Sequence, residues 1–486
     1  MRAVLVLLLI SSSAAASPNL SEDDPVYDEL TVLRARGELP AYLGGVRPLT
    51  ERRARQLLGR PIGVDRPGWW VAPITRLLAT ASLDHEAARP YSTVIRPRDL
   101  TGALALSCEH VQGRPCGDGL GLASELDTSA GYGPWLSASL RLRARTGTDA
   151  HDSGVDLDRI YINADLGPVT TELGRDVLAL GPSSRTQLGW GDHAPPLDHV
   201  RVATSRPLDL AGDHGSLVRG SLMYLVGRLR APQTYPGTLV TIARGQLDLG
   251  DELELGMMQL LELGGDGAPS FTPWGFVLEH VRRADKSASA TDSSNRRIGF
   301  DVSTRIASLR GARFYYQLVF EDLRKRALDA FRYDADHLIG VELASLGPVG
   351  VTVEWQQTGV RSQEHYPRTT GFTNAGRLVG SPLGPDAQAV FAGARIELGW
   401  GTALPWLELA RLASDTYTFV DHGPILRTGT GVSEVRYRAG TRVRLPLERG
   451  LRAEVEARFE HVAREAFEPG AHRDNVGATA SVIWQP

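Results

Sequence analysis

The chain has 486 residues, of which 23% are charged and 42% hydrophobic, and this composition excludes a disordered chain or a coiled coil. The net charge of −4, from 53 basic and 57 acidic side chains, gives no electrostatic reason to expect nucleic acid as a partner. Mean hydropathy is −0.17 and no run of about 18 apolar residues occurs, which excludes a helical membrane protein. A membrane β-barrel stays open, because only every second residue of its strands faces lipid.

The first residues have the composition of a secretory signal peptide. Arg2 is basic, residues 3–10 are an unbroken apolar run, and Ala14 to Ala16 form a small-residue cleavage site. We therefore predict that residues 1–16 are removed on export. The mature chain is expected to begin without a lipid-bearing cysteine.

The next segment has helical patterns. Pro25 opens a run that ends at Gly37, and a second run extends from Thr50 to Leu58. Residues 75–88 suggest a third helix. Together these patterns predict a small helical bundle over residues 17–92.

From about residue 98 the hydrophobic period changes to two, as in β-strands. Even positions from Leu136 to Ala144 are apolar, while Arg141, Arg143 and Arg145 occupy the other face. Segments 349–355, 451–460 and 476–484 repeat this alternation. Further strands are expected around Tyr161, Glu172, Leu222, Leu239, Leu253, Val277, Phe300, Tyr316, Val341, Ile396, Leu407 and Tyr437.

The polar strand faces separate two β architectures. They carry mixed charges, such as Arg452, Glu454, Glu456, Arg458 and Glu460, which a wet barrel lumen tolerates and can pair across strands. The pattern therefore favours a membrane barrel over a soluble β-rich secreted protein. The low aromatic content of 7% argues the other way, because barrels carry aromatic girdles.

Cys108 and Cys116 are the only cysteines. Export permits a disulfide, and Gly113 and Pro115 suit a short closed loop. A disulfide is the favoured interpretation, with free thiols as the alternative, because a metal site would need more ligands.

Seven blocks of the chain resemble, in the same order, segments of the Wzi family of outer-membrane capsule assembly proteins. The most specific contains Gly174-Arg175, followed by Trp190-Gly191 and Ala194-Pro195, although a compact turn of the family is split here between Gly181-Pro182 and Trp190-Gly191. The blocks are 27–37, 173–182, 188–195, 255–267, 295–301, 316–322 and 377–386.

The resemblance implies a mainly β fold: a transmembrane antiparallel barrel of about eighteen strands over residues 93–486, with the helical bundle plugging its periplasmic end. It also implies a lectin-like protein of the cell outer membrane that attaches capsular or surface polysaccharide to the cell exterior. The expected partners are that polysaccharide, outer-membrane lipid and the barrel assembly machinery, and the protein is expected to be a monomer.

One polar stretch is a candidate polysaccharide site. An indole can stack on a sugar ring, and carboxylates accept hydrogen bonds from sugar hydroxyls. The favoured alternative is a loop or plug in which these groups satisfy one another. The candidate residues are Arg175, Trp190, Asp192, His193, Asp198 and His199.

No enzyme is expected, because the common hydrolase, metalloprotease and nucleotide-binding motifs are absent from the sequence. Glu454 and Glu456 share a strand face as glycosidase carboxylates would, but Arg452 and Arg458 would keep both ionised. We expect neither a metal nor a cofactor. The alternative functions are a porin or solute channel, and a secreted soluble enzyme.

Overall fold

The structure of the protein is a computed structural model. It describes residues 17–21, 24–39, 45–59, 69–82, 119–132, 135–147, 153–210, 217–250, 252–270, 272–281, 294–321, 327–364, 368–413, 416–419, 425–428 and 431–484. The predicted signal peptide and the predicted disulfide lie outside these residues.

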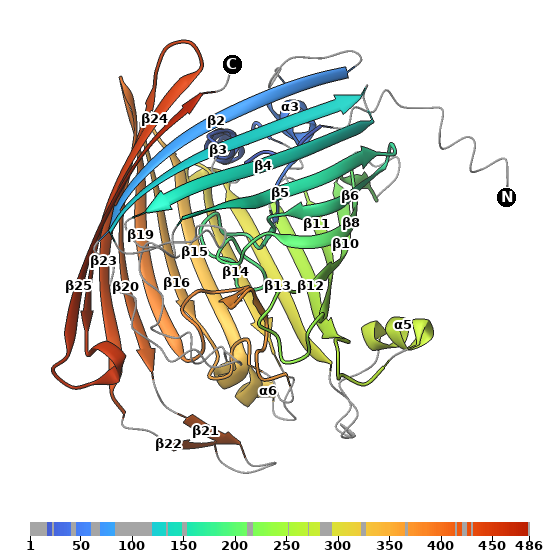
Figure 1. Ribbon diagram of the computed structural model, residues 1–486, viewed down its shortest axis with the longest axis vertical. Coiled ribbons are helices and arrows are strands. Elements are labelled where there is room, and N and C mark those ends of the chain that lie inside the picture. The colour runs from blue at the N-terminus through green and yellow to red at the C-terminus, as the bar shows by residue number, and fades with distance from the viewer. Residues whose placement is uncertain are drawn as a thin grey trace.

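Eighteen antiparallel strands form a closed barrel, in which β2 pairs with both β3 and β25 (Figure 1). The strands are β2 (Trp69–Ser82), β3 (Gly119–Tyr132), β4 (Leu136–Gly147), β5 (Gly154–Asp165), β6 (Val169–Asp176), β8 (Leu197–Thr204), β10 (Val218–Arg228), β11 (Leu239–Leu249), β12 (Leu253–Leu263), β13 (Asn295–Ile306), β14 (Ala312–Phe320), β15 (Ala335–Leu346), β16 (Val349–Gln357), β19 (Ala387–Leu398), β20 (Gly401–Ala413), β23 (Ser433–Pro446), β24 (Leu451–Ala463) and β25 (His472–Trp484).

Helices and short strands precede the barrel strands or lie in the connections between them. They are α2 (Val26–Arg36), α3 (Glu51–Leu58), α5 (Pro273–Val281), α6 (Ala327–Asp329) with the π-turn η4 (Ala330–Asp334), η3 (Ala307–Leu309), η5 (Glu465–Phe467), β1 (Val46–Arg47), β7 (Ala179–Leu180), β9 (Leu208–Asp209), β17 (Thr373–Asn374), β18 (Arg377–Leu378), β21 (Thr416–Phe419) and β22 (Ile425–Thr428). None of the helices in the described part of the chain is long and apolar enough to cross a membrane.

The two ends of the barrel differ in their connections. At one end, the turn end, neighbouring strands are joined by short turns such as 347–348 and 399–400. At the other, the loop end, they are joined by long segments such as 177–196 and 358–386. Outer-membrane barrels have short periplasmic turns and longer external loops, so the turn end corresponds to the periplasmic side.

Side chains alternate between lipid and lumen as predicted. On β20, Leu407 is 63% exposed on the outer face whereas Glu408 is buried inside. The charged faces line the lumen and pair across strands. Arg141 lies opposite Asp127 with a 2.6 Å ion pair, and Arg438 lies opposite Glu460 with another of 2.6 Å. The ladders expected from the sequence are therefore confirmed.

Aromatic side chains gather at the turn end, on the outside of the barrel. Tyr132 and Trp135 stand together near one turn, while Trp400 and Trp484 are exposed near others. This is the interfacial position that aromatic girdles occupy in membrane barrels. A chain poor in aromatics can therefore supply a girdle by placing a few of them at one level.

The two N-terminal helices are confirmed. Thr50 caps α3 by accepting a hydrogen bond from the Arg53 backbone N–H at 3.2 Å, and Gly37 ends α2 with a φ of 77°. Both helices contribute to one apolar cluster. Its buried members are Leu20, Tyr27, Leu30, Leu39 and Ala54.

These helices lie inside the turn-end mouth (Figure 1). Ion pairs tie them to different sides of the wall: Arg34 to Glu254 of β12 at 2.7 Å, Asp28 to Arg444 of β23, and Arg52 to Asp165 of β5. The N-terminal segment therefore spans the mouth.

Two secondary-structure predictions are wrong. The helix expected over residues 75–88 is strand β2 as far as Ser82, because the barrel closes only when a strand pairs with both β3 and β25. The barrel thus begins at Trp69, earlier than the expected residue 93. The strand expected around Val277 is helix α5, which lies between β12 and β13 in the chain.

The assignment of strand faces to lipid or lumen predicts that an added charge destabilises the barrel on the lipid face but much less on the luminal face. Leu407→Arg should destabilise the folded barrel by about 2–4 kcal/mol, because an arginine near the bilayer midplane is poorly solvated. Thr479→Arg, which faces the lumen opposite Glu456, should cost much less. Urea unfolding from lipid vesicles measures both, and equal losses would contradict the assigned facing.

Candidate functional site

Buried polar side chains tie the N-terminal segment to the luminal wall. Glu172 of β6 accepts hydrogen bonds from His199 Nε2 at 2.8 Å, Arg201 at 2.7 Å and the Asn19 side chain at 2.7 Å. Asn19 also donates to Asp176, which pairs with Arg159 at 2.6 Å. One asparagine from outside the barrel strands thus bridges two buried carboxylates of β6.

Two long connections fold inward from the loop end. We call residues 177–196 the first luminal loop and residues 358–364 with 368–386 the second. The first is held to the wall by Gln317 of β14, which accepts from the Leu188 N–H at 3.0 Å and donates to Leu180 O at 3.1 Å. Ser183 hydrogen bonds Glu354, and Arg185 pairs with Glu408.

The second luminal loop is held by a buried ion cluster. Arg297 of β13 pairs with both Glu321 and Asp336 at 2.6 Å. Asp336 accepts hydrogen bonds from the Gly359 N–H and the Ser362 hydroxyl, each at 2.8 Å. The wall carboxylates are therefore satisfied partly by the wall and partly by the loop, which orders the loop inside the barrel.

The two luminal loops also hold each other. The Gly191 N–H donates to Val379 O at 2.7 Å, and a Cβ at Gly380 would lie only 2.3 Å from Leu188 O. Only glycine permits this approach. Leu188, Trp190, Phe372 and Val379 join wall residues in one apolar cluster within the barrel.

The structure does not bring the six predicted site residues together: some lie in the lumen and others on the outer face of the wall. Trp190 is 1% exposed and His193 is equally buried, so the indole has no face open to a sugar. Asp192 is partly exposed between them. His199 belongs to the buried Glu172 network. Trp190 and His193 are buried, as the plug interpretation of this stretch expects, and a sugar contact by these residues stays a hypothesis.

Arg175 and Asp198 lie elsewhere. They pair through two hydrogen bonds of 2.6 and 2.9 Å, and Arg175 is in register with Ile160, which is exposed on the outer face. The pair therefore stands on the outside of the wall at the loop end. Asp176, the next residue in the chain, points into the lumen and pairs with Arg159.

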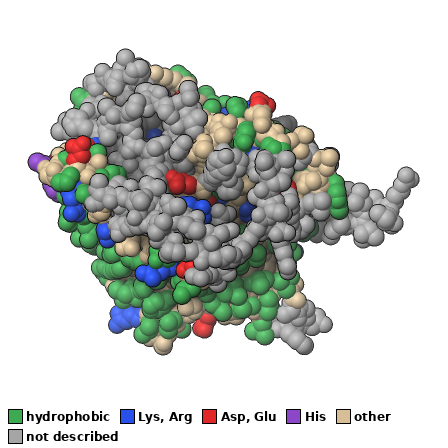
Figure 2. Space-filling model, turned by 90° about the horizontal axis from the view of Figure 1, so that it is seen from below, with side chains coloured by type: hydrophobic (Ala, Val, Ile, Leu, Met, Phe, Trp, Pro, Cys, Tyr) green, Lys and Arg blue, Asp and Glu red, His purple; other side chains and the backbone are tan. Residues whose placement is uncertain are grey.

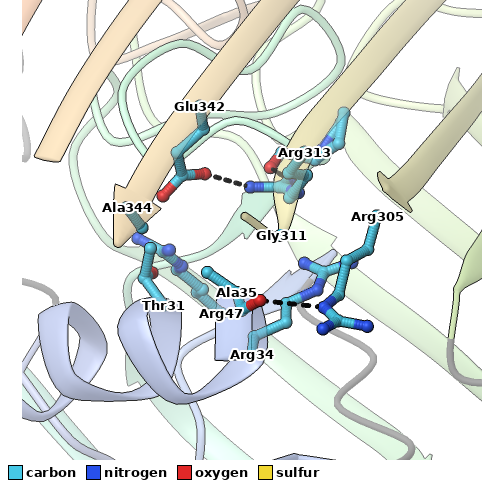
Figure 3. Close-up of a pocket in the computed structure, with 10 residues that line it drawn as sticks. Thr31, Arg34, Ala35, Arg47, Arg305, Gly311, Arg313, Glu342 and Ala344 are labelled. Carbon is cyan, nitrogen blue, oxygen red and sulfur yellow. Dashed lines mark hydrogen bonds and ion pairs between the residues drawn. The ribbon is translucent and has the colours of Figure 1, made fainter. Parts of the chain in front are cut away.

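Figure 3 shows where helix α2, the first luminal loop and the wall meet at the turn end. The pocket there is lined by four arginines. Arg305 donates to Ala35 O at the end of α2 at 3.0 Å, while Arg313 pairs with Glu342 at 2.6 Å and donates to Pro182 O. These contacts bind the plug to the wall. The four are Arg34, Arg47, Arg305 and Arg313.

Hydroxyl and amide groups of residues 233–234 and 369–373 cover the luminal loops at the loop end of the barrel, and we call them the loop-end cap. Gln233 donates to Thr373 O at 2.7 Å, and the Thr234 hydroxyl lies 3.2 Å from that of Thr369. Arg368 lies 5.0 Å from the centre of the Tyr235 ring. Burial lowers the pKa of Arg368, and the nearby Glu262 carboxylate opposes this shift. Within the described residues, no group of three or more His, Cys, Asp or Glu is placed to hold a metal ion.

A family model for the capsule assembly protein Wzi matches residues 104–476. The chain belongs to the Wzi capsule assembly family. It is an outer-membrane β-barrel, as the family and the apolar outer face require. The expectations for family and location drawn from the sequence are confirmed.

Solved structures agree with the fold of this Wzi-family chain. It is similar to Wzi of Escherichia coli, described as an outer-membrane carbohydrate-binding β-barrel involved in group 1 capsule assembly, with 14% identity, a TM-score of 0.68, and coverage of 96% of this chain and 99% of that chain. It is also similar to OccD1 (OprD), with 10% identity, a TM-score of 0.50, and coverage of 87% and 97%. At these identities the likeness concerns the fold alone. No curated protein sequence matches the chain significantly.

Several residues that organise the Wzi-family lumen were missed from the sequence. Asn19, Arg297, Asp336 and Glu354 are buried polar groups whose partners come from distant segments. Their only sequence signal is a charge at an inward position of a strand or, for Asn19, an amide in the segment that precedes α2. That signal gives the facing of a side chain but not its partner.

The burial of Trp190 predicts how this loop responds to substitution. Trp190→Ala should lower the stability of the folded barrel by about 3–5 kcal/mol, because it opens a cavity in the luminal cluster. Asp192→Ala, at a partly exposed position, should cost less. Heat-modifiable mobility on gels measures barrel stability, and normal stability together with weak polysaccharide retention for both variants would restore the sugar-contact hypothesis.

Proposed function

We propose that this protein is a lectin-like anchor for capsular or other surface polysaccharide. It binds the glycan at its loop end, holds it at the cell exterior and carries out no chemical step on it. The name of its structural relative, a carbohydrate-binding barrel of capsule assembly, supports this proposal.

The observation that carries the proposal is the content of the lumen. An eighteen-stranded barrel is wide enough for an aqueous channel. Here two luminal loops pack on each other and on the wall, and α2 and α3 lie across the turn-end mouth. Such a barrel is suited to present a rigid surface rather than to conduct solutes.

The loop-end cap has the chemistry of a sugar-binding surface. Hydroxyl, amide and guanidinium groups can exchange hydrogen bonds with sugar hydroxyls, and the ring of Tyr235 can pack against a sugar. Figure 2 looks onto this end and shows acidic and basic side chains close together around its middle. We propose that Tyr235 and its polar neighbours Gln233, Thr234 and Thr369 contact the glycan.

This assignment predicts a selective effect at one aromatic position. Tyr235→Ala should weaken polysaccharide binding by roughly tenfold, because an aromatic packing contact contributes about 1–1.5 kcal/mol. Tyr235→Phe, which keeps the ring, should bind almost as the parent protein. Binding of purified polysaccharide to the detergent-solubilised barrel measures this, and unchanged binding by a folded Tyr235→Ala variant would refute the contact.

The alternative function is a solute channel, because a barrel of eighteen strands is wide enough for an aqueous lumen. The anchor proposal predicts no large stable conductance in planar bilayers, because loops and helices obstruct the lumen. Large open channels from folded protein would favour the pore instead. An open barrel of known conductance, reconstituted in the same way, provides the positive control.

The proposal includes the state and partners of the protein. One chain supplies all eighteen strands, so no second chain is needed to close the barrel, and the proposal takes the protein as a monomer. The final strand β25 ends at the aromatic Trp484 and closes the barrel on β2, which supports insertion by the barrel assembly machinery.

A further inference from the structure

Two loop-end segments fold back over the outside of the barrel. Helix α5 contacts β10, β11 and β12 through His280, and the α6–η4 segment packs on β14 and β15. The facing of the wall residues beneath them is set by alternation. Met223 and Leu225 belong to the luminal cluster, so Tyr224 between them points outward, and Tyr316 points outward because Tyr315 is luminal.

A histidine fastens α5 to this outer face. His280 Nδ1 donates to Phe276 O within the helix at 2.8 Å. Its Nε2 then carries the one lone pair of the ring, which faces the hydroxyls of Tyr224 at 3.1 Å and Thr241 at 2.9 Å. Thr241 points outward yet is 1% exposed, because the helix covers it.

The α6–η4 segment uses the same pair of side chains. His337 of β15 donates from Nε2 to Phe331 O at 2.8 Å and accepts at Nδ1 from the Tyr316 hydroxyl at 2.8 Å. His337 also points outward and is buried, and Ala330 is buried against the wall. Helix α5 therefore satisfies a wall hydroxyl through His280, whereas the α6–η4 segment satisfies the ring N–H of His337, the wall histidine that holds the Tyr316 hydroxyl.

The surfaces that these segments turn away from the wall are apolar. Trp274 is 67% exposed and Leu328 is 76% exposed, and Val277 and Phe331 are also exposed. We call these four residues the apolar collar. They continue the lipid-facing wall, where Leu222, Phe300 and Ile339 are exposed on the strands beneath.

Charged side chains on the outer face indicate where the collar lies along the barrel axis. Arg175, Asp198 and Arg228 form one outward row at the loop ends of β6, β8 and β10. Tyr224 and Thr241, which hold α5, lie farther from the loop end on their strands. The collar thus stands between a charged rim and the apolar wall, where interfacial amphipathic helices settle in membranes.

We propose that the apolar collar inserts into the headgroup–acyl boundary of the outer leaflet of the outer membrane. It completes, over β10 to β15, the loop-end counterpart of the aromatic girdle that the strands themselves carry at the turn end. The collar sets the depth of the barrel in the membrane. This inference is independent of glycan binding.

Depth-dependent quenching of Trp274 tests the proposal. The full chain is reconstituted into phospholipid vesicles whose acyl chains carry bromine either near the headgroup or near the terminal methyl. The emission of Trp274 is the difference between the parent protein and Trp274→Phe. Shallow bromines should quench it at least about twofold more strongly than deep bromines, as expected for an interfacial side chain.

Two tryptophans provide matched controls in the same vesicles. Trp400, obtained from Trp400→Phe, belongs to the turn-end girdle and should also be quenched by shallow bromines, whereas the buried Trp190, obtained from Trp190→Phe, should not. Trp274 emission that neither bromine position quenches would place the collar in water or against another protein and overturn the proposal. Stronger quenching by deep bromines would overturn it as well.

A tether variant tests the architecture beneath the collar. His280→Ala removes the ring that faces the Tyr224 and Thr241 hydroxyls and should reduce shallow quenching of Trp274. Unchanged quenching would contradict the role of His280 in seating α5.

Discussion

Pairing of arginine with carboxylate inside the barrel is the interaction on which the rest of this structure depends. Wall side chains cannot fill a lumen of this width, and the charges that line it must each find a partner. Neighbouring strands supply some partners, as at Arg141 and Asp127. The luminal loops supply others, as where Asp336 accepts from Gly359 and Ser362. Wall carboxylates that lack enough hydrogen-bond donors on neighbouring strands therefore bind donors of the loops, and this holds the loops inside the barrel.

Inside the barrel, the apolar side chains of the two luminal loops pack together with wall residues and form a hydrophobic core in the lumen. The apolar cluster around Trp190 and Phe372 lies within a lumen that would otherwise hold water, and the close approach at Gly380 joins the two loops. A packed interior gives the loop-end cap a rigid base, and rigid support is what a binding surface needs. The same packing obstructs conduction, so the anchor and channel hypotheses are separated by one structural feature.

The lipid-facing surface is built differently at the two ends of the barrel. At the turn end, aromatic side chains such as Trp400 project directly from the barrel wall or its turns. At the loop end over β10 to β15, the wall carries Tyr224, Thr241 and His337, whose polar atoms need cover. Helix α5 and the α6–η4 segment supply both the hydrogen bonds and an apolar exterior.

The sequence by itself determined the period of two, the facing of strands such as β4 and β24, the charge ladders, the first two helices and the family, because these depend on local spacing. Only the tertiary structure decided which groups meet. Residues 75–82 became a strand because closure required one, and α5 replaced a strand near Val277. Trp190 was buried, and Arg175 paired with Asp198 on the outer face. Alternation fixes the side on which a residue lies, whereas its partner depends on strand register and loop path, which join positions far apart in the chain.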